Sequence, residues 1–305
     1  MSFQRTILVP VTPELAAREP YHTVPFTVPP GTRSLEVSYE VGGKASAADP
    51  PGSGNVVDIG LLDPRAAGFP ARDGFRGWSG SARSSFQLSE SGATPGYLPG
   101  PLPAGEWNIV LGLYRIMPGA HTVTVTVRGS EEDLAPAATP AAPATRAAGS
   151  PHAGWFRGDL HAHTHHSDAR GSLDDLLEMA RRRGLDYLAV TDHNTVSHHA
   201  PLLAADTGGL TVIPGQELTT YRGHTNMLGL PGWVDFRFTD DDRLRLALAD
   251  ARERGALRVI NHPKPTGCDW EYGEWEDFDL FEVWNGPWPT RNWVSVRRWH
   301  DRLAA

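Results

Sequence analysis

The sequence contains almost no cysteine. Cys268 is the single thiol among 305 residues, so a disulfide within the chain is impossible and nothing points to an oxidising compartment. No run of about 18 apolar residues occurs that could cross a membrane, and the first residues lack the apolar segment and cleavage site of a secretion signal. We therefore expect a soluble protein without membrane contact, located in the cytoplasm.

Basic residues are also in the minority. The 28 lysines and arginines face 36 aspartates and glutamates, which gives a formal net charge of -8. General nucleic-acid binders usually present a basic surface, so this balance argues against that class. It does not exclude a small phosphorylated substrate held by metal ions. A hydrophobic content of 40% in a chain of this length allows a sizeable core, in two domains or in one large domain.

Residues 1–131 favour β-structure. Polar and apolar side chains alternate over 34–41 and 121–127, as they do in strands with one buried face. Glycine and proline punctuate the segments between such runs, and short strands at this spacing are typical of a β-sandwich. From 132 to 153 the chain is rich in alanine and proline and has no apolar periodicity, which predicts an extended linker.

Residues 154–305 alternate between strand and helix patterns. One helix is expected from Ser172, which acidic residues follow, to Gly184, and another over 241–254. Alternation of this kind implies parallel strands joined by crossovers, so we expect a barrel-like α/β domain. The apolar runs predicted as strands are 155–160, 185–190, 210–213, 225–230, 256–260 and 280–284.

Two histidines follow the first of these strands. His161 and His163 lie two residues apart, and side chains with this spacing point to one face of an extended chain. Both imidazoles can therefore bind one metal ion. A single pair of this kind is weak evidence, because two histidines fall this close by chance in many sequences.

The pair gains weight from its surroundings, because eleven of the thirteen histidines lie at or after His152. Barrels of the α/β class place their active sites at the carboxyl ends of the strands. Histidines and carboxylates without cysteine suit zinc, manganese or iron in a hydrolytic site better than a closed structural zinc site. The further candidate ligands near strand ends are Asp168, Asp192, His193, Glu217, His224 and His262.

The order of these motifs resembles the polymerase-and-histidinol-phosphatase (PHP) family of metal-dependent hydrolases. The matching segments are 158–164 with 167–168, 191–194, 215–217, 223–224 and 261–263. The resemblance implies a distorted seven-stranded β/α barrel with two or three divalent metal ions at the carboxyl ends of its strands. The N-terminal half looks like the accessory domain of the carbaryl-hydrolase-like branch, through segments 63–65, 77–80 and 96–100.

The resemblance also implies which residues hold the ions. The implied sets are His161, His163 and Glu217 for a first ion, Glu217, His224 and His262 for a second, and Asp168 with His193 for a third. The family pattern ends with an Asp-x-His motif after a seventh strand. The sequence has only His300-Asp301 there, in the reverse order. We therefore expect a barrel that lacks its last strand.

The expected chemistry is hydrolysis. Two ions that share Glu217 would lower the pKa of a bridging water toward neutrality and bind an ester or phosphoryl oxygen as Lewis acids. No protein nucleophile is then needed, and we expect a phosphoester bond in a small molecule or nucleotide as the substrate. Asp192 could orient His193 or cap the following turn. His198 could protonate a leaving group or lie in a surface loop.

Two cations near the ligand motifs have two interpretations each. Lys264 and Arg222 could neutralise the charge of a phosphate, or they could be ordinary solvated charges. Two other functions also stay open. The N-terminal resemblance suggests carbamate or carboxyl-ester hydrolysis, and the missing Asp-x-His motif suggests a metal-stabilised binding module without catalysis. The sequence identifies no partner for the N-terminal half.

Overall fold

The computed structural model describes residues 2–45, 49–50, 52–134 and 154–304. These residues divide into two compact units. The N-terminal unit is Met1–Pro140 with His165–Asp168, and the C-terminal unit is Ala141–Thr164 with Ala169–Ala305. Of the predicted linker over 132–153, residues 135–153 lie outside the described residues.

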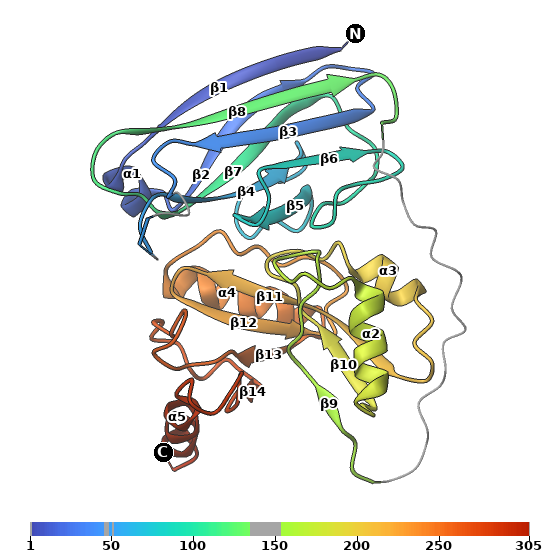
Figure 1. Ribbon diagram of the computed structural model, residues 1–305, viewed down its shortest axis with the longest axis vertical. Helices are drawn as coiled ribbons and strands as arrows, with labels where there is room; N and C mark the ends of the chain where they lie inside the picture. The colour runs from blue at the N-terminus through green and yellow to red at the C-terminus, as the bar shows by residue number, and fades with distance from the viewer. Residues whose placement is uncertain (1, 46–48, 51, 135–153, 305) are drawn as a thin grey trace. The chain divides into compact units, whose positions relative to one another are not determined.

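The described part of the N-terminal unit is rich in β-structure and forms two antiparallel four-stranded sheets (Figure 1). A short helix, α1 (Pro13–Arg18), is capped by the Thr12 side chain, which accepts a hydrogen bond from the backbone of Leu15. The first sheet has the order β1 (Phe3–Val11), β8 (His121–Ser130), β3 (Ser34–Val41) and β6 (Ser85–Ser89). The second has the order β2 (Tyr21–Val28), β7 (Gly105–Arg115), β4 (Val56–Leu62) and β5 (Phe75–Gly80).

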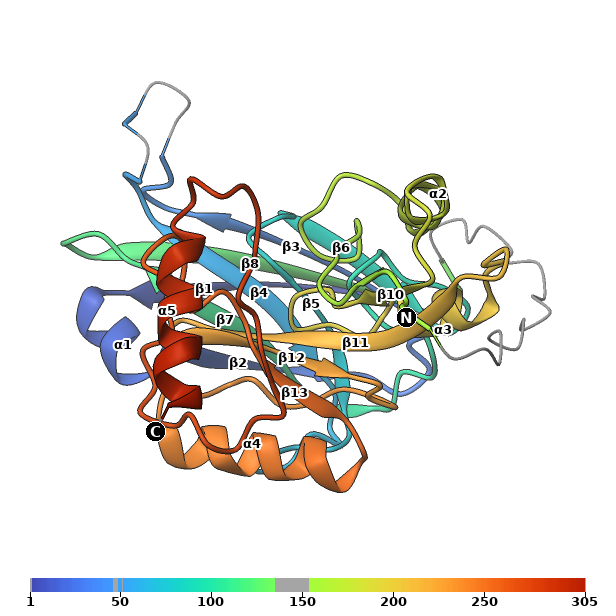
Figure 2. The same ribbon diagram turned by 90° about the horizontal axis from the view of Figure 1, so that it is seen from below.

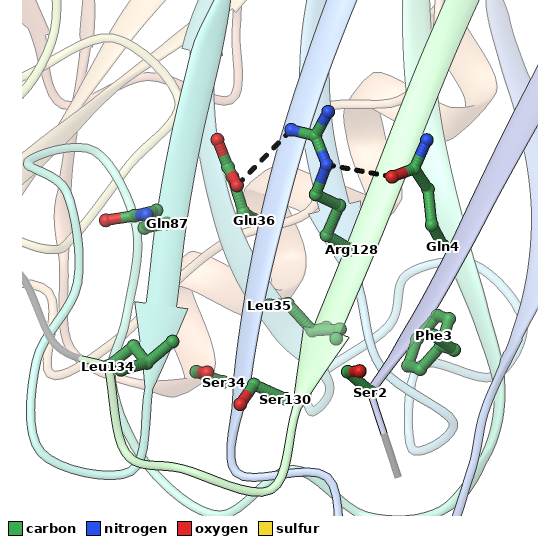
Figure 3. A pocket seen from close by; sticks show the side chains of 11 residues that line it. Ser2, Phe3, Gln4, Ser34, Leu35, Glu36, Gln87, Arg128, Ser130 and Leu134 are labelled. Atoms are coloured by element: carbon green, nitrogen blue, oxygen red, sulfur yellow. Dashed lines mark hydrogen bonds and ion pairs between the residues drawn. The ribbon is translucent and has the colours of Figure 1, made fainter.

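Alternating side chains explain why these strands pack as they do. In β8 the valines at 123, 125 and 127 are fully buried, whereas the residues between them are not. One hydrophobic core contains these valines together with side chains of the other sheet, including the fully buried Trp107 of β7. The polar side chains Gln4, Glu36 and Arg128 project from the opposite face of the first sheet and line a groove, where Arg128 donates hydrogen bonds to Gln4 and Glu36 (Figure 3).

The described part of the C-terminal unit forms one curled sheet of six strands. Its order is β14 (Leu280–Phe281), β13 (Leu257–Ile260), β12 (Gly223–Leu228), β11 (Thr211–Thr220), β10 (Tyr187–Val190) and β9 (Gly158–Asp159). Neighbouring strands are parallel except at β12, which runs antiparallel to both β11 and β13. Within residues 154–304 the sheet therefore has β9 and β14 as its edges, and a seventh strand is not among them.

The prediction of parallel strands throughout this unit was wrong at β12. Strand β11 ends at Thr220 and β12 begins at Gly223, so only two residues connect them. A parallel pair requires a crossover of a dozen or more residues, whereas a two-residue turn joins antiparallel strands. Figure 2 shows β11 and β12 lying side by side with β13 next to them. The strand β11 also extends beyond the predicted 210–213, so Glu217 lies inside it.

Four helices occur in the described part of this unit: α2 (Leu173–Arg182), α3 (His199–Ala204), α4 (Asp241–Glu253) and α5 (Asn292–Leu303). Helix α2 begins as predicted at Ser172, which forms a reciprocal capping box with Asp175. Its buried residues Leu173 and Leu177 pack with Leu188 of β10. None of the helices in the described residues is long and apolar enough to cross a lipid bilayer.

Candidate metal centre

The carboxylate of Glu217 is the centre of a histidine cluster. Glu217 is fully buried in β11, and each of its oxygens faces imidazole nitrogens. Its Oε2 lies 3.3 Å from His161 Nε2, 3.3 Å from His163 Nε2 and 2.9 Å from His193 Nδ1. Its Oε1 lies 3.1 Å from His224 Nδ1 and 3.3 Å from His262 Nε2.

The order of the strands brings these side chains together (Figure 1). His161 and His163 follow β9, His193 follows β10, and His262 follows β13. His224 lies on β12 directly opposite Thr219, which is two residues after Glu217 and on the same face of β11. His262 has a φ of 29°, a left-handed backbone conformation that is uncommon for a residue other than glycine.

The spacing of the ligand atoms fits divalent metal ions. Two sets of candidate ligands share Glu217, and within each set the ligand atoms lie within 4.8 Å of one another. One set is His161, Glu217 and His262, and the other is His193, Glu217 and His224. His161 Nε2 and His163 Nε2 lie 3.1 Å apart. Ligand atoms about 2.0–2.1 Å from a tetrahedral ion lie about 3.3 Å from one another, so these nitrogens have the separation of two ligands of one ion.

The hydrogen bonding of Glu217 supports the same interpretation. Oε2 is buried and has no hydrogen-bond partner among the described residues, although three ring nitrogens face it. A buried carboxylate oxygen without a donor is costly, and a bound cation would satisfy it. Oε1 accepts a hydrogen bond from Asn261 Nδ2 at 2.8 Å, which holds the carboxylate in place.

The charges of the cluster shift the pKa values of its members. Burial raises the pKa of Glu217, but the charges of His193, His161 and His224 outweigh it and hold the pKa well below its usual value. Burial lowers the pKa of His163 to about 4, together with the charges of neighbouring histidines. At neutral pH Glu217 is therefore ionised and His163 is neutral, which are the forms that bind metal ions. Burial lowers the pKa of His161, but Glu217 and Glu282 outweigh it and raise this pKa to about 10, so a metal ion would have to displace a proton from His161.

Comparison with known proteins identifies this part of the chain. The model of the family described as PHP domain matches residues 159–261. These residues are a PHP domain. A matching solved structure is a two-domain protein from Bacteroides vulgatus, which contains a predicted PHP-like metal-dependent phosphoesterase. It is 23% identical, with a TM-score of 0.28, and the match covers 40% of this chain and 39% of that chain. No curated protein matches the sequence.

The PHP domain brings most of the predicted ligands together. His161, His163, His193, Glu217 and His224 lie inside the matched residues, and His262 follows them directly. His161 and His163 share one oxygen of Glu217, and His224 and His262 share the other, as in the implied sets. The ligand atoms can also be grouped with His262 beside His161 and His193 beside His224. Asp168 is exposed and belongs to the N-terminal unit, and it stays a predicted ligand.

Asp192 and His198, which were predicted to act in catalysis, are both fully buried in the PHP domain. The two oxygens of Asp192 accept hydrogen bonds from the backbone and the hydroxyl of Thr164, each at 2.7 Å. His198 Nδ1 lies 3.1 Å from Asp192, and its Nε2 lies 3.0 Å from the carbonyl of Val190. These contacts fix the loop after His163, and they leave neither side chain exposed to a substrate.

The two cations near the ligand motifs have structural contacts. Lys264 is only 3% exposed, and its Nζ donates hydrogen bonds to Asn285 and Asn292 at 2.5 and 2.8 Å. Arg222 donates to the carbonyls of Thr239 and Glu271 and lies over the ring of Tyr272. Both side chains therefore connect loops in the structure, and the phosphate-binding interpretation gains no support.

Sequence reasoning missed three residues that support the ligands. Thr219 Oγ1 lies 2.7 Å from His193 Nδ1, and Asn261 binds Glu217 as described above. Glu282 lies 3.0 Å from His161 Nδ1 and accepts a hydrogen bond from the backbone of His262. The sixth predicted strand, 280–284, covered Glu282, whereas β14 ends at Phe281. A correct strand end would have placed Glu282 directly after a strand, which is the position by which other candidate ligands were recognised.

Proposed function

We propose that the PHP domain is a metal-dependent hydrolase that cleaves phosphoester bonds in a small molecule or nucleotide. The observation that carries the proposal is the buried carboxylate of Glu217, which faces five imidazoles and is shared by two sets of ligand atoms. Divalent zinc, manganese or iron ions bound there would supply Lewis acidity and a water of lowered pKa for attack on an ester.

The candidate ligands would bind two metal ions in two sets. His161 and His262 would hold one ion with Glu217, and His193 and His224 would hold another. The negative charge of Glu217 would compensate part of the charge of both ions, and its burial would keep this interaction strong. His163 is close enough to His161 to join the first set. A third ion with Asp168 and His193 stays part of the proposal, as the family resemblance implies.

The chemistry of the thiol also favours a mechanism without a protein nucleophile. Burial raises the pKa of Cys268, the only cysteine of the chain, to about 11. The thiol is therefore protonated at neutral pH, and the protonated form is a poor nucleophile. Attack by an activated water agrees with this property and with the donor set around Glu217.

We extend the proposal to the architecture. The curled sheet would be part of a distorted (β/α)7 barrel over residues 154–305, and the two N-terminal sheets would form an accessory β-sandwich over 1–131, joined by a linker over 132–153. The shared core of the two sheets supports the sandwich, and the order of the strands and the domain match support the barrel. The cytoplasmic location predicted from the sequence belongs to the same proposal.

The test is hydrolysis by the purified full chain after metal analysis. We expect turnover of bis-p-nitrophenyl phosphate or p-nitrophenyl phosphate with added Mn²⁺ or Zn²⁺, and loss of turnover with EDTA. Glu217→Gln should abolish it, whereas Glu253→Gln, which changes an exposed carboxylate of α4, should not. Turnover of aryl carbamates alone would replace the phosphoester assignment by carbamate hydrolysis. Tight metal binding without any turnover would favour a non-catalytic module.

A further inference from the structure

Glu282 joins two candidate ligands that come from opposite parts of the sheet. It lies directly after β14, and its side chain is only 13% exposed. Its Oε1 lies 3.0 Å from His161 Nδ1, and its Oε2 accepts a hydrogen bond from the backbone nitrogen of His262 at 2.7 Å. Asn285 Nδ2 donates a third hydrogen bond to Oε1 at 3.2 Å. One carboxylate therefore contacts both histidines of a single ligand set.

The contact with His161 selects which of its nitrogens can bind an ion. The Nδ1 atom faces Glu282, and the opposite nitrogen, Nε2, lies 3.3 Å from Glu217 Oε2. A carboxylate accepts hydrogen bonds only, so it stabilises the form with the proton on Nδ1. The lone pair of Nε2 is then directed at the position shared with Glu217. A carboxylate in this role fixes the ring orientation of a ligand and raises its basicity.

The contact with His262 holds its backbone. A φ of 29° is unfavourable for histidine, and such conformations persist where surrounding contacts determine them. The hydrogen bond from the His262 backbone nitrogen to Glu282 is one such contact. The side chain of the same residue faces Glu217, with Nε2 3.3 Å from Oε1. The direction of the His262 side chain thus depends on the same carboxylate that orients His161.

We propose that Glu282 is a positioning residue for one metal ion, the ion held by His161, Glu217 and His262. This inference rests on the proposed metal-dependent function. The histidines of the second set come from other elements, because His193 follows β10 and His224 lies on β12. Glu282 acts through the two histidines of the first set, so its loss weakens one binding site and leaves the other.

The experiment measures metal affinity rather than turnover. Zn²⁺ dissociation constants of the full chain are determined by competition with a chromophoric chelator, and Co²⁺ absorption spectra report the ligand geometry. Glutamine at 282 has the size of glutamate but only one acceptor oxygen, so it cannot accept from both His161 and the backbone of His262. Glu282→Gln should weaken one of two sites by about 10–100-fold and change its Co²⁺ spectrum. His224→Ala should weaken the other site, and Glu253→Gln neither.

The outcomes separate this inference from the proposed function. A wild-type chain that binds no Zn²⁺ or Co²⁺ overturns both. If the wild-type chain binds metal at two sites and Glu282→Gln has the same two affinities and the same Co²⁺ spectrum, only the role of Glu282 is overturned. If that variant does not fold, nitrogen-15 NMR of the wild-type Zn²⁺ form decides the question. The proton of His161 is expected on Nδ1, and a proton on Nε2 contradicts the inference.

Discussion

Replacement of Asp192 by asparagine tests whether this residue anchors a loop or takes part in the reaction. Both of its carboxylate oxygens bind Thr164, one through the backbone nitrogen and one through the hydroxyl, and both residues are fully buried. Thr164 follows His163 directly, so the carboxylate fixes the start of the loop after that candidate ligand. We expect Asp192→Asn to lower the free energy of unfolding of the C-terminal unit.

The magnitude follows from the two hydrogen bonds. A hydrogen bond to a charged group contributes about 1.5–3 kcal/mol, and asparagine keeps one acceptor oxygen but replaces the other by an amide donor. The new amide can donate to the Thr164 hydroxyl, which also accepts, so both charge-assisted bonds become neutral and we expect a loss of about 1–3 kcal/mol. Thr164→Val removes only the bond from the hydroxyl and should cost about 1.5–3 kcal/mol. Because both changes act on that bond, the double variant should cost less than the sum.

The assay is urea unfolding of the full chain in EDTA, followed by near-ultraviolet circular dichroism, so that metal binding adds nothing to the stability. Asp301→Asn, at an exposed position of α5, is the control and should change the stability by less than about 0.5 kcal/mol. Unchanged stability in Asp192→Asn together with lost hydrolysis would refute the loop-anchor interpretation. Asp192 would then have the catalytic role that the sequence analysis predicted.

Three further predictions concern the metal, the thiol and the N-terminal unit. Zn²⁺ at a thousandfold excess over its dissociation constant should stabilise the chain by about 4 kcal/mol in thermal unfolding, and Glu217→Gln should lose this shift. Burial raises the pKa of Cys268 from 9.0 to about 11, so the thiol ionises in the unfolded chain at a lower pH than in the folded chain. The free energy of unfolding should therefore fall as the pH rises from 9 to about 11. Labelling of the folded chain by iodoacetamide should accelerate over the same pH range. Arg76→Met should destabilise the N-terminal unit by about 3–5 kcal/mol, because the carbonyls of Leu98, Gly100 and Pro101 lose their charged, buried donor, while Asp63 keeps its ion pair with Arg65. The exposed Arg128→Met should cost less than about 1 kcal/mol in the same urea titration, and equal losses for both arginines would contradict this reasoning.

Much of the fold could be predicted because its signals are local. The helix start at Ser172 depends on a side chain that binds the backbone three residues away. The buried face of β8 depends on alternation along one strand. The histidines of the metal centre were recognised for the same reason, because positions directly after strands predict convergence whatever the exact strand order.

The remaining features depend on distant partners. The direction of β12 follows from the turn between Thr220 and Gly223, but the predicted end of the preceding strand lay too early to show that turn. Lys264 is held by oxygens 21 to 28 residues away, and nothing in its neighbourhood distinguishes it from a solvated cation.

The sequence by itself determined that a histidine and carboxylate cluster lies at the ends of strands in a domain without cysteine ligands. Only the tertiary structure decided which of these residues form a set, which ones are buried supports, and that Glu282 contacts His161 across 121 residues of chain. The physical reason is that side-chain spacing and capping act within one element. Coordination and hydrogen bonding between elements depend on the order and direction of all the strands that lie between them.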